Sequence, residues 1–170
     1  MTEREYLALP EEKPYLEFVD GLIEEKPMPD GHHRRLSGEF TGVFWSYQKT
    51  AGGDLGPEGR VHLRAGLYRI PDTAYWAPGR PAGDDSLPSV AVEVRSPNQS
   101  LSDLREKCRA YREYGIDAVW LVDPLRRTVE VFEGAQDGTV LRVGDTLTSA
   151  AMPGFALPLA ELFAVLDRPR

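Results

Sequence analysis

From the N-terminus onward, the apolar positions are spaced first as in extended strands and then as in a helix. Two short apolar stretches between Tyr15 and Met28 flank the dipeptide Asp20-Gly21. Asp-Gly is preferred in two-residue hairpin turns, because both central residues there take positive φ. The pattern therefore predicts a β-hairpin near the N-terminus.

A helical period follows this hairpin. Apolar side chains recur at spacings of three and four, which places them on one helical face: His33, Leu36, Phe40, Val43, Phe44 and Tyr47. Gly52-Gly53 ends the helix, and Gly56–Gly59 has the composition of a turn. Short extended runs occupy residues 60–77. The loop at 78–88 is rich in Gly, Pro and Asp, and we expect its tip to be mobile.

The next segments read as strand, helix and strand. Residues 88–96 form a β-branched run that ends at a proline, as a mostly buried strand would. A helix follows to about Tyr114, capped by Ser100 or Ser102 and ended by Gly115. Its core face is Leu101, Leu104, Cys108 and Tyr111.

Two further strands, at 118–124 and 128–134, and a short C-terminal helix complete the pattern. A strand, a helix and a strand in this order favour a crossover that joins parallel strands. We therefore predict an α/β core with a hairpin attached. The chain has 170 residues, no internal repeat and no linker, so we expect a single domain over residues 1–170.

Cysteine content and hydropathy exclude several classes of protein. The lone Cys108 cannot form an internal disulfide, and no Cys/His cluster has the spacing of a zinc site. No run approaches the roughly 18 apolar residues of a spanning helix, and the N-terminus has no apolar signal core. We expect a cytoplasmic protein with no membrane partner.

The formal net charge of −7 and the pI near 5.0 argue against a dedicated duplex-binding protein. Non-specific affinity for DNA rests largely on neutralisation of phosphates by Lys and Arg. The acidic total does not exclude a nuclease, because active-site carboxylates bind cations and a local basic patch can persist.

Asp72, Glu93 and Lys107 are the residues that could carry chemistry. Glu93 lies within an apolar strand, where an unpaired carboxylate would be costly, so it pairs with a cation, binds a metal or becomes neutral. The alternative is a Glu at the exposed strand end, paired with Arg95 or Arg109.

Lys107 lies on the following helix, four residues after Asp103 and four before Tyr111. From the edge of the apolar stripe it can place its ammonium near the strand end. Spacing alone favours an ordinary Asp103–Lys107 surface pair. Two carboxylates at neighbouring strand ends with a nearby lysine are an arrangement for phosphodiester hydrolysis, with Mg²⁺ or Mn²⁺ held by the carboxylates.

Four segments resemble the Uma2 family (DUF820) of the PD-(D/E)XK nuclease superfamily: YLEFVDGLIEEKPMPDGHHRRLSGEF, RIPDTAYW, the long stretch SVAVEVRSPNQSLSDLREKCRAYREYGIDAVWLVDPLRRTVEVFEG, and GDTLTSAAMPGFALPLAELF. The resemblance covers about residues 15–165. It implies a restriction-endonuclease-like core, with a mixed β-sheet flanked by helices and an N-terminal β-hairpin.

The resemblance also implies roles for matching residues. Asp72 corresponds to the Asp of the PD motif and Glu93 to the acidic residue of the (D/E)XK motif, so both would ligate a metal. Arg95 stands where a lysine is expected, and Lys107 occupies the position of a lysine displaced to the next helix. Arg95 stays protonated and would be a poor proton acceptor.

Further residues enter the predicted site as support. Glu17 resembles an extra acidic residue that adds a ligand or orients a water, and the backbone carbonyl of Val94 would be a further metal ligand. His33 matches the helix-leading histidine of the family, which we interpret as packed or hydrogen-bonded. Asp103 and Tyr111 are possible supporting residues on the helix.

The sequence thus predicts a Mg²⁺-dependent or Mn²⁺-dependent endonuclease that hydrolyses DNA. The alternatives are an inactive nuclease-fold module for binding or assembly, and a hydrolase of another phosphate ester. Exposed strand edges and the apolar run Val119–Val122 leave room for a homodimer, which would present two active sites to a duplex.

Overall fold

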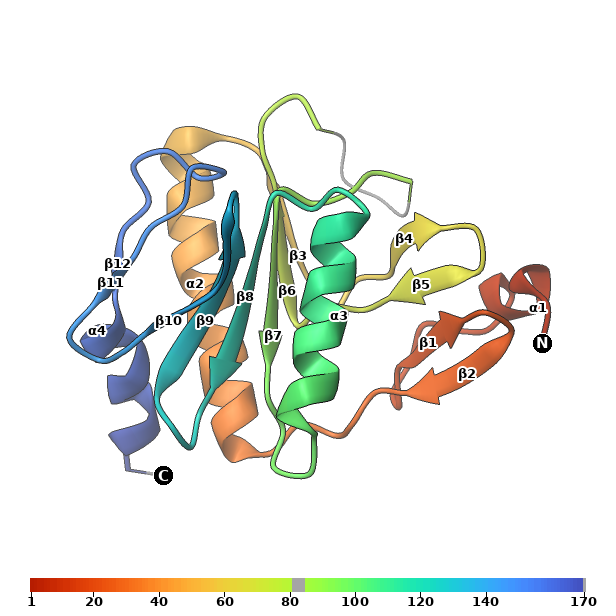
Figure 1. The fold of residues 1–170 in the computed structure, drawn as a ribbon, viewed down its shortest axis with the longest axis horizontal. Helices are drawn as coiled ribbons and strands as arrows, with labels where there is room; N and C mark the ends of the chain where they lie inside the picture. The colour runs from red at the N-terminus through yellow and green to blue at the C-terminus, as the bar shows by residue number, and fades with distance from the viewer. Residues whose placement is uncertain (81–84, 170) are drawn as a thin grey trace.

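The computed structural model describes residues 1–80 and 85–169, and a mixed six-stranded sheet lies at its centre (Figure 1). The strand order is β10-β9-β8-β7-β6-β3. Only β7 and β8 are parallel; the other described neighbours pair antiparallel. The strands are β3 (Asp54–Pro57), β6 (Thr73–Trp76), β7 (Val90–Val94), β8 (Ala118–Asp123), β9 (Thr128–Glu133) and β10 (Gln136–Leu141).

Two long helices cover opposite faces of this sheet (Figure 1). Side chains alternate along β7, so Val90, Val92 and Val94 join the core under α2 (Gly31–Ala51). Ala91 joins the core under α3 (Leu101–Glu113). Glu93 lies two residues after Ala91 in the same strand, and its side chain is therefore directed to the same face of the sheet, under α3. The crossover from β7 through α3 to β8 is confirmed.

A second, antiparallel sheet lies beside α3 and has the order β2-β1-β5-β4 (Figure 1). Its strands are β1 (Leu16–Val19), β2 (Leu22–Glu25), β4 (Val61–Arg64) and β5 (Leu67–Arg69). The predicted hairpin is β1–β2, and Asp20 and Gly21 take φ of 49° and 89°, as its turn requires. The hairpin is not an isolated appendage, because β1 also pairs with β5.

The two ends of the chain add small elements. At the N-terminus α1 (Glu3–Leu7), which the sequence pattern did not predict, buries Tyr6 against Phe18. Near the C-terminus, β11 (Thr146–Leu147) pairs with β12 (Leu157–Pro158). The predicted C-terminal helix is α4 (Leu159–Ala164), followed by η1 (Val165–Asp167). Both pack against the core under α2.

Some local predictions were wrong. Gly56 and Pro57, interpreted as part of a turn, belong to the edge strand β3, where pairing with β6 outweighs the turn composition. The pattern also missed β10. The predicted mobile tip of the loop falls on residues 81–84 and lies outside the described residues. Within the described part of the chain, no helix is long and apolar enough to cross a membrane.

The run Val119–Val122 was proposed as a surface for a homodimer, and this argument is wrong. All four side chains are at most 1% exposed, because β8 is a central strand covered on both faces. A homodimer therefore stays a prediction that rests on strand edges alone. The mass in solution by light scattering tests it.

Gly53 is expected to be intolerant of a side chain. Its φ is +83°, and an added Cβ would lie 2.3 Å from the Trp76 carbonyl oxygen. We expect Gly53→Ala to lower the free energy of unfolding by more than about 2 kcal/mol. Gly42→Ala is the control, since nothing lies within 4 Å on the exposed face of α2. It should raise stability by roughly 0.5–1 kcal/mol. Urea denaturation measures both, and equal effects would contradict the prediction.

Candidate active site

The carboxyl end of β7 and the first turns of α2 and α3 lie at the same end of the large sheet (Figure 1). Thr73 of β6 is in register with Val92 of β7, so Asp72, one residue earlier, lies alongside Glu93. The Asp72 N–H donates to the Val92 carbonyl at 2.9 Å. Strand pairing therefore brings the two carboxylates predicted from the sequence side by side.

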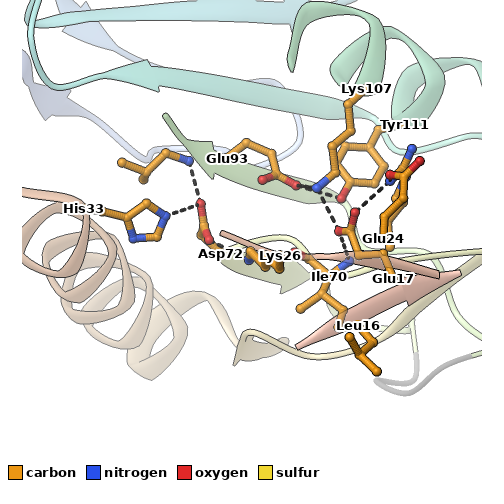
Figure 2. A network of polar contacts seen from close by, with 12 residues as sticks. Leu16, Glu17, Glu24, Lys26, His33, Ile70, Asp72, Glu93, Lys107 and Tyr111 are labelled. Atoms are coloured by element: carbon orange, nitrogen blue, oxygen red, sulfur yellow. Dashed lines mark hydrogen bonds and ion pairs between the residues drawn. The ribbon is translucent and has the colours of Figure 1, made fainter. Parts of the chain in front are cut away.

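Asp72 is 1% exposed, and its two oxygens have different surroundings (Figure 2). Oδ2 accepts the Val94 N–H at 2.6 Å and lies 3.1 Å from Nε2 of His33. Oδ1 lies 2.6 Å from the ammonium of Lys26, without the alignment of a hydrogen bond, and has no hydrogen-bond partner in the described chain. One oxygen is thus held by donors, and the other faces a cation.

Glu93 is 2% exposed and lies under α3. Its Oε1 accepts the Tyr111 hydroxyl at 2.8 Å and lies 2.9 Å from the ammonium of Lys107. The alternative interpretation of an exposed Glu93 paired with an arginine is therefore wrong. Arg95 pairs with Asp123 at 2.9 Å, and Arg109 pairs with Asp137 at 3.2 Å.

Lys107 connects the two sheets. Its ammonium lies 2.8 Å from Oε1 of Glu17 on β1 and 2.9 Å from Glu93 on β7 (Figure 2). Glu17 is 4% exposed, and its oxygens also accept the Ile70 N–H at 2.8 Å and Arg69 at 2.7 Å. The predicted surface pair with Asp103 is wrong, because the lysine side chain turns inward to this buried pair of glutamates.

Lys26 is a member of this cluster that the sequence analysis missed. It follows β2 directly, and its side chain is 9% exposed. Besides facing Asp72, its ammonium donates to the Ile70 carbonyl at 2.8 Å. Its only sequence signal is a lone lysine after two glutamates and before Pro27, which is typical of an exposed loop.

The charges in the cluster stabilise one another. Burial alone would raise the pKa of Asp72, but Lys26 and His33 hold it well below its usual range. Burial raises the pKa of Glu93, and Lys107 only partly offsets this. Glu17 and Glu93 raise the pKa of Lys107 against the opposing effect of burial. Lys107 is therefore a cation that donates hydrogen bonds, and not a proton acceptor.

A cavity of about 610 Å³ opens between the β1–β2 hairpin and α3. Glu17, Lys26 and Lys107 line it, whereas Asp72 and Glu93 lie beneath them and are not among its lining residues. Exposed acidic side chains surround the opening: Glu24, Glu25, Asp103 and Glu106. A molecule that enters from solvent thus meets the two ammonium groups before it reaches the two buried carboxylates.

The sequence profile of the Uma2 family, described as "Putative restriction endonuclease", matches residues 4–160. The chain belongs to the Uma2 family. No curated protein matches the sequence. Together, the family and the fold support a nuclease.

One solved structure agrees with this assignment. The chain is similar to "a putative nuclease belonging to DUF820 from Anabaena variabilis ATCC 29413", with 26% identity, a TM-score of 0.86, and coverage of 98% of this chain and 99% of the other. A second match, to a DrdV–DNA complex, has 19% identity and a TM-score of 0.46, and covers 74% of this chain and 11% of the other. The predicted restriction-endonuclease-like α/β fold is confirmed.

The remaining residues predicted from the Uma2 resemblance lie at different depths. Tyr111 is buried and holds Glu93, and His33 is buried and contacts Asp72. The backbone of Val94 contacts Asp72 through its N–H; the role of its carbonyl stays a prediction. Asp103 is exposed at the cavity opening, where its N–H is bonded to Ser100 at the start of α3.

The Lys107 ammonium neutralises two buried glutamates in this Uma2 site, so its removal should be costly. We expect Lys107→Met to lower the free energy of unfolding by about 3–5 kcal/mol in metal-free buffer. Lys49→Met removes an exposed ammonium that lies over the Trp45 ring, and should cost less than about 1 kcal/mol. Chemical denaturation compares the two. A Lys107→Met loss no larger than that of the control would contradict the buried pairing.

Proposed function

We propose that this chain is a Mg²⁺-dependent or Mn²⁺-dependent endonuclease that hydrolyses phosphodiester bonds in DNA. The observation that carries the proposal is the pair of buried carboxylates, Asp72 and Glu93, on neighbouring strands, with the Lys107 ammonium 2.9 Å from Glu93. Uma2 membership adds that this pair lies in a nuclease fold.

The donor set suits a hard divalent cation. Asp72 and Glu93 offer carboxylate oxygens, and Asp72 Oδ1 is buried and faces the ammonium of Lys26 at 2.6 Å, a position suited to a cation. Among the described residues, no three His, Cys, Asp or Glu side chains form a metal-binding group. Mg²⁺ needs no larger group, because it is usually bound by one or two carboxylates and keeps water or phosphate oxygens as its other ligands. Val94 would add its carbonyl.

The bound ion would polarise the phosphate and lower the pKa of a water molecule. The protein's own groups would do the rest. His33 and the Val94 N–H hold Asp72, and Tyr111 holds Glu93. Lys107 stays charged, so it would orient the attacking water or stabilise charge at phosphorus by donating hydrogen bonds. Glu17 would keep the Lys107 ammonium in place.

Cleavage of supercoiled plasmid in Mg²⁺ or Mn²⁺ tests the proposal. We expect wild-type protein to nick and linearise the plasmid, and Asp72→Asn and Glu93→Gln each to lower the rate at least about 100-fold, since each removes one charged oxygen ligand at unchanged size. Lys107→Met should also lose activity. Lys49→Met is the control, because Lys49 is an exposed lysine in the last turn of α2, whereas the first turn of that helix lies at the site.

Activity that persists in Glu93→Gln would indicate a contaminant or a different site. If no variant and no wild-type protein cuts DNA across metals and salt, the proposal fails. The acidic residues around the cavity opening would then favour the alternatives, a binding or assembly module or a hydrolase of another phosphate ester.

A second cavity, of about 330 Å³, supports DNA as the partner. It lies on the other side of α3, and its charged lining residues are Arg105, Arg126, Arg142, Asp123 and Glu130. Arg105 is paired with Glu130 at 2.9 Å, so Arg126 and Arg142 are the arginines offered to DNA. Glu93 is in register with Leu121, and Leu121 with Glu130, so Glu130 lies two strands from the site, roughly 10 Å away. These arginines would contact phosphates beside the one being cleaved.

Salt dependence of DNA binding tests this surface. The Arg126 side chain is 61% exposed, and its ion pair with Asp123 is long, at 3.6 Å, so a phosphate can compete for the guanidinium. We expect Arg126→Ala and Arg142→Ala each to weaken binding to all DNA sequences and to reduce the slope of log K against log salt by about 1. The control is Arg4→Ala, on α1 beyond the hairpin, which should leave the slope unchanged (Figure 1). Equal slopes in all variants would place the DNA elsewhere.

A further inference from the structure

The Lys26 ammonium lies in the position that a cation bound to Asp72 would take. Oδ2 of Asp72 already accepts the Val94 N–H and contacts His33. Oδ1 is the oxygen left for a metal ion, and it faces Lys26 at 2.6 Å. An ammonium nitrogen and a ligated ion cannot both lie this close to one oxygen.

Lys26 also stands between Asp72 and the cavity. It is a lining residue of the 610 Å³ cavity, and Asp72 is not. Its backbone is fixed, because its N–H donates to the Tyr15 carbonyl at 2.8 Å. Its long side chain is held at its end by the hydrogen bond to the Ile70 carbonyl and by the ion pair with Asp72. The ammonium can therefore leave Asp72 for the cavity by rotation of side-chain bonds alone, with the hairpin unmoved.

We propose that Lys26 is a resident counter-ion of the metal-free site, which neutralises Asp72 and is displaced from it when a divalent cation binds. The identity of the ion as Mg²⁺ or Mn²⁺ rests on the proposed function. In the metal-free protein Lys26 offsets the cost of a buried carboxylate. In the presence of metal it competes for the same oxygen, so the apparent metal affinity is lower than the ligands alone would give.

Binding of Mn²⁺ to the whole chain, followed by calorimetry and by electron paramagnetic resonance, tests the competition without any nuclease assay. We expect Lys26→Met to tighten Mn²⁺ binding about tenfold, within the usual range of coupling between two ligands. The same variant should be less stable than wild type in metal-free buffer and should gain more in melting temperature on addition of Mn²⁺. Simple damage to the site would weaken binding instead.

Two variants serve as controls. Lys13→Met removes the same charge from an exposed lysine, paired with Glu58 at 3.5 Å, and should leave the Mn²⁺ affinity within about twofold of wild type, because exposed charges are screened. Lys26→Arg keeps a cation beside Asp72 and should not tighten binding. If Lys26→Met does not fold without metal, refolding in Mn²⁺ followed by back-titration with a chelator gives the affinity.

Unchanged or weaker Mn²⁺ binding in folded Lys26→Met would overturn the inference. The proposed function is tested separately. If wild-type protein cuts DNA, Lys26→Met should reach half-maximal cleavage at about a tenfold lower metal concentration. Tighter Mn²⁺ binding in a protein that cuts no DNA would uphold the exchange and reject the nuclease. Normal cleavage by the wild-type protein, with the same Mn²⁺ affinity in Lys26→Met as in wild type, would uphold the nuclease and reject the exchange.

Discussion

Three buried carboxylates, Glu17, Asp72 and Glu93, lie at the junction of the two sheets (Figure 2). Three cations neutralise them: Lys26, Lys107 and Arg69. Burying a carboxylate without a partner is costly, and removing one partner from a buried pair is costlier than replacing the pair. The contact of Lys107 with both Glu17 and Glu93 therefore constrains the structure as a whole. It requires the hairpin sheet to lie against α3, and so forms the wall of the large cavity.

The same neutralisation suits a site that receives a cation. The two carboxylates proposed as metal ligands lie beneath ammonium groups, and the surrounding opening is acidic. A polyanion would be repelled by that opening until cations bind, whereas the arginines on the far side of α3 are the groups proposed to contact phosphate. This separation reconciles a net charge of −7 with a nuclease fold. In the proposed function, the charges of the buried cluster serve the metal, and the arginines that would contact DNA lie to one side.

Much of the fold could be predicted because its signals are local. Asp20-Gly21 predicts the hairpin turn, because this dipeptide tolerates positive φ at both positions, and helical spacing predicts α2 and α3. Prediction failed for elements whose sequence signal is weak or atypical. The edge strand β3 has a turn-like composition, and α1 has five residues, too few for a clear period. The homodimer argument from Val119–Val122 failed because an apolar run cannot distinguish a covered strand from an exposed one.

The sequence by itself determined the crossover from β7 through α3 to β8. It marked Glu93, since a carboxylate in an apolar strand is conspicuous, whereas Asp72 was matched through the Pro-Asp motif of the Uma2 resemblance. Only the tertiary structure decided which charges meet. Lys107 pairs with Glu17, 90 residues away, and not with Asp103 one turn away, while Lys26 reaches the Ile70 carbonyl 44 residues on. Helical spacing predicts only the contacts between residues of the same helix. Pairing across two sheets depends on how those sheets dock, and that is set by the packing of the whole core and by the cost of leaving buried charge unpaired.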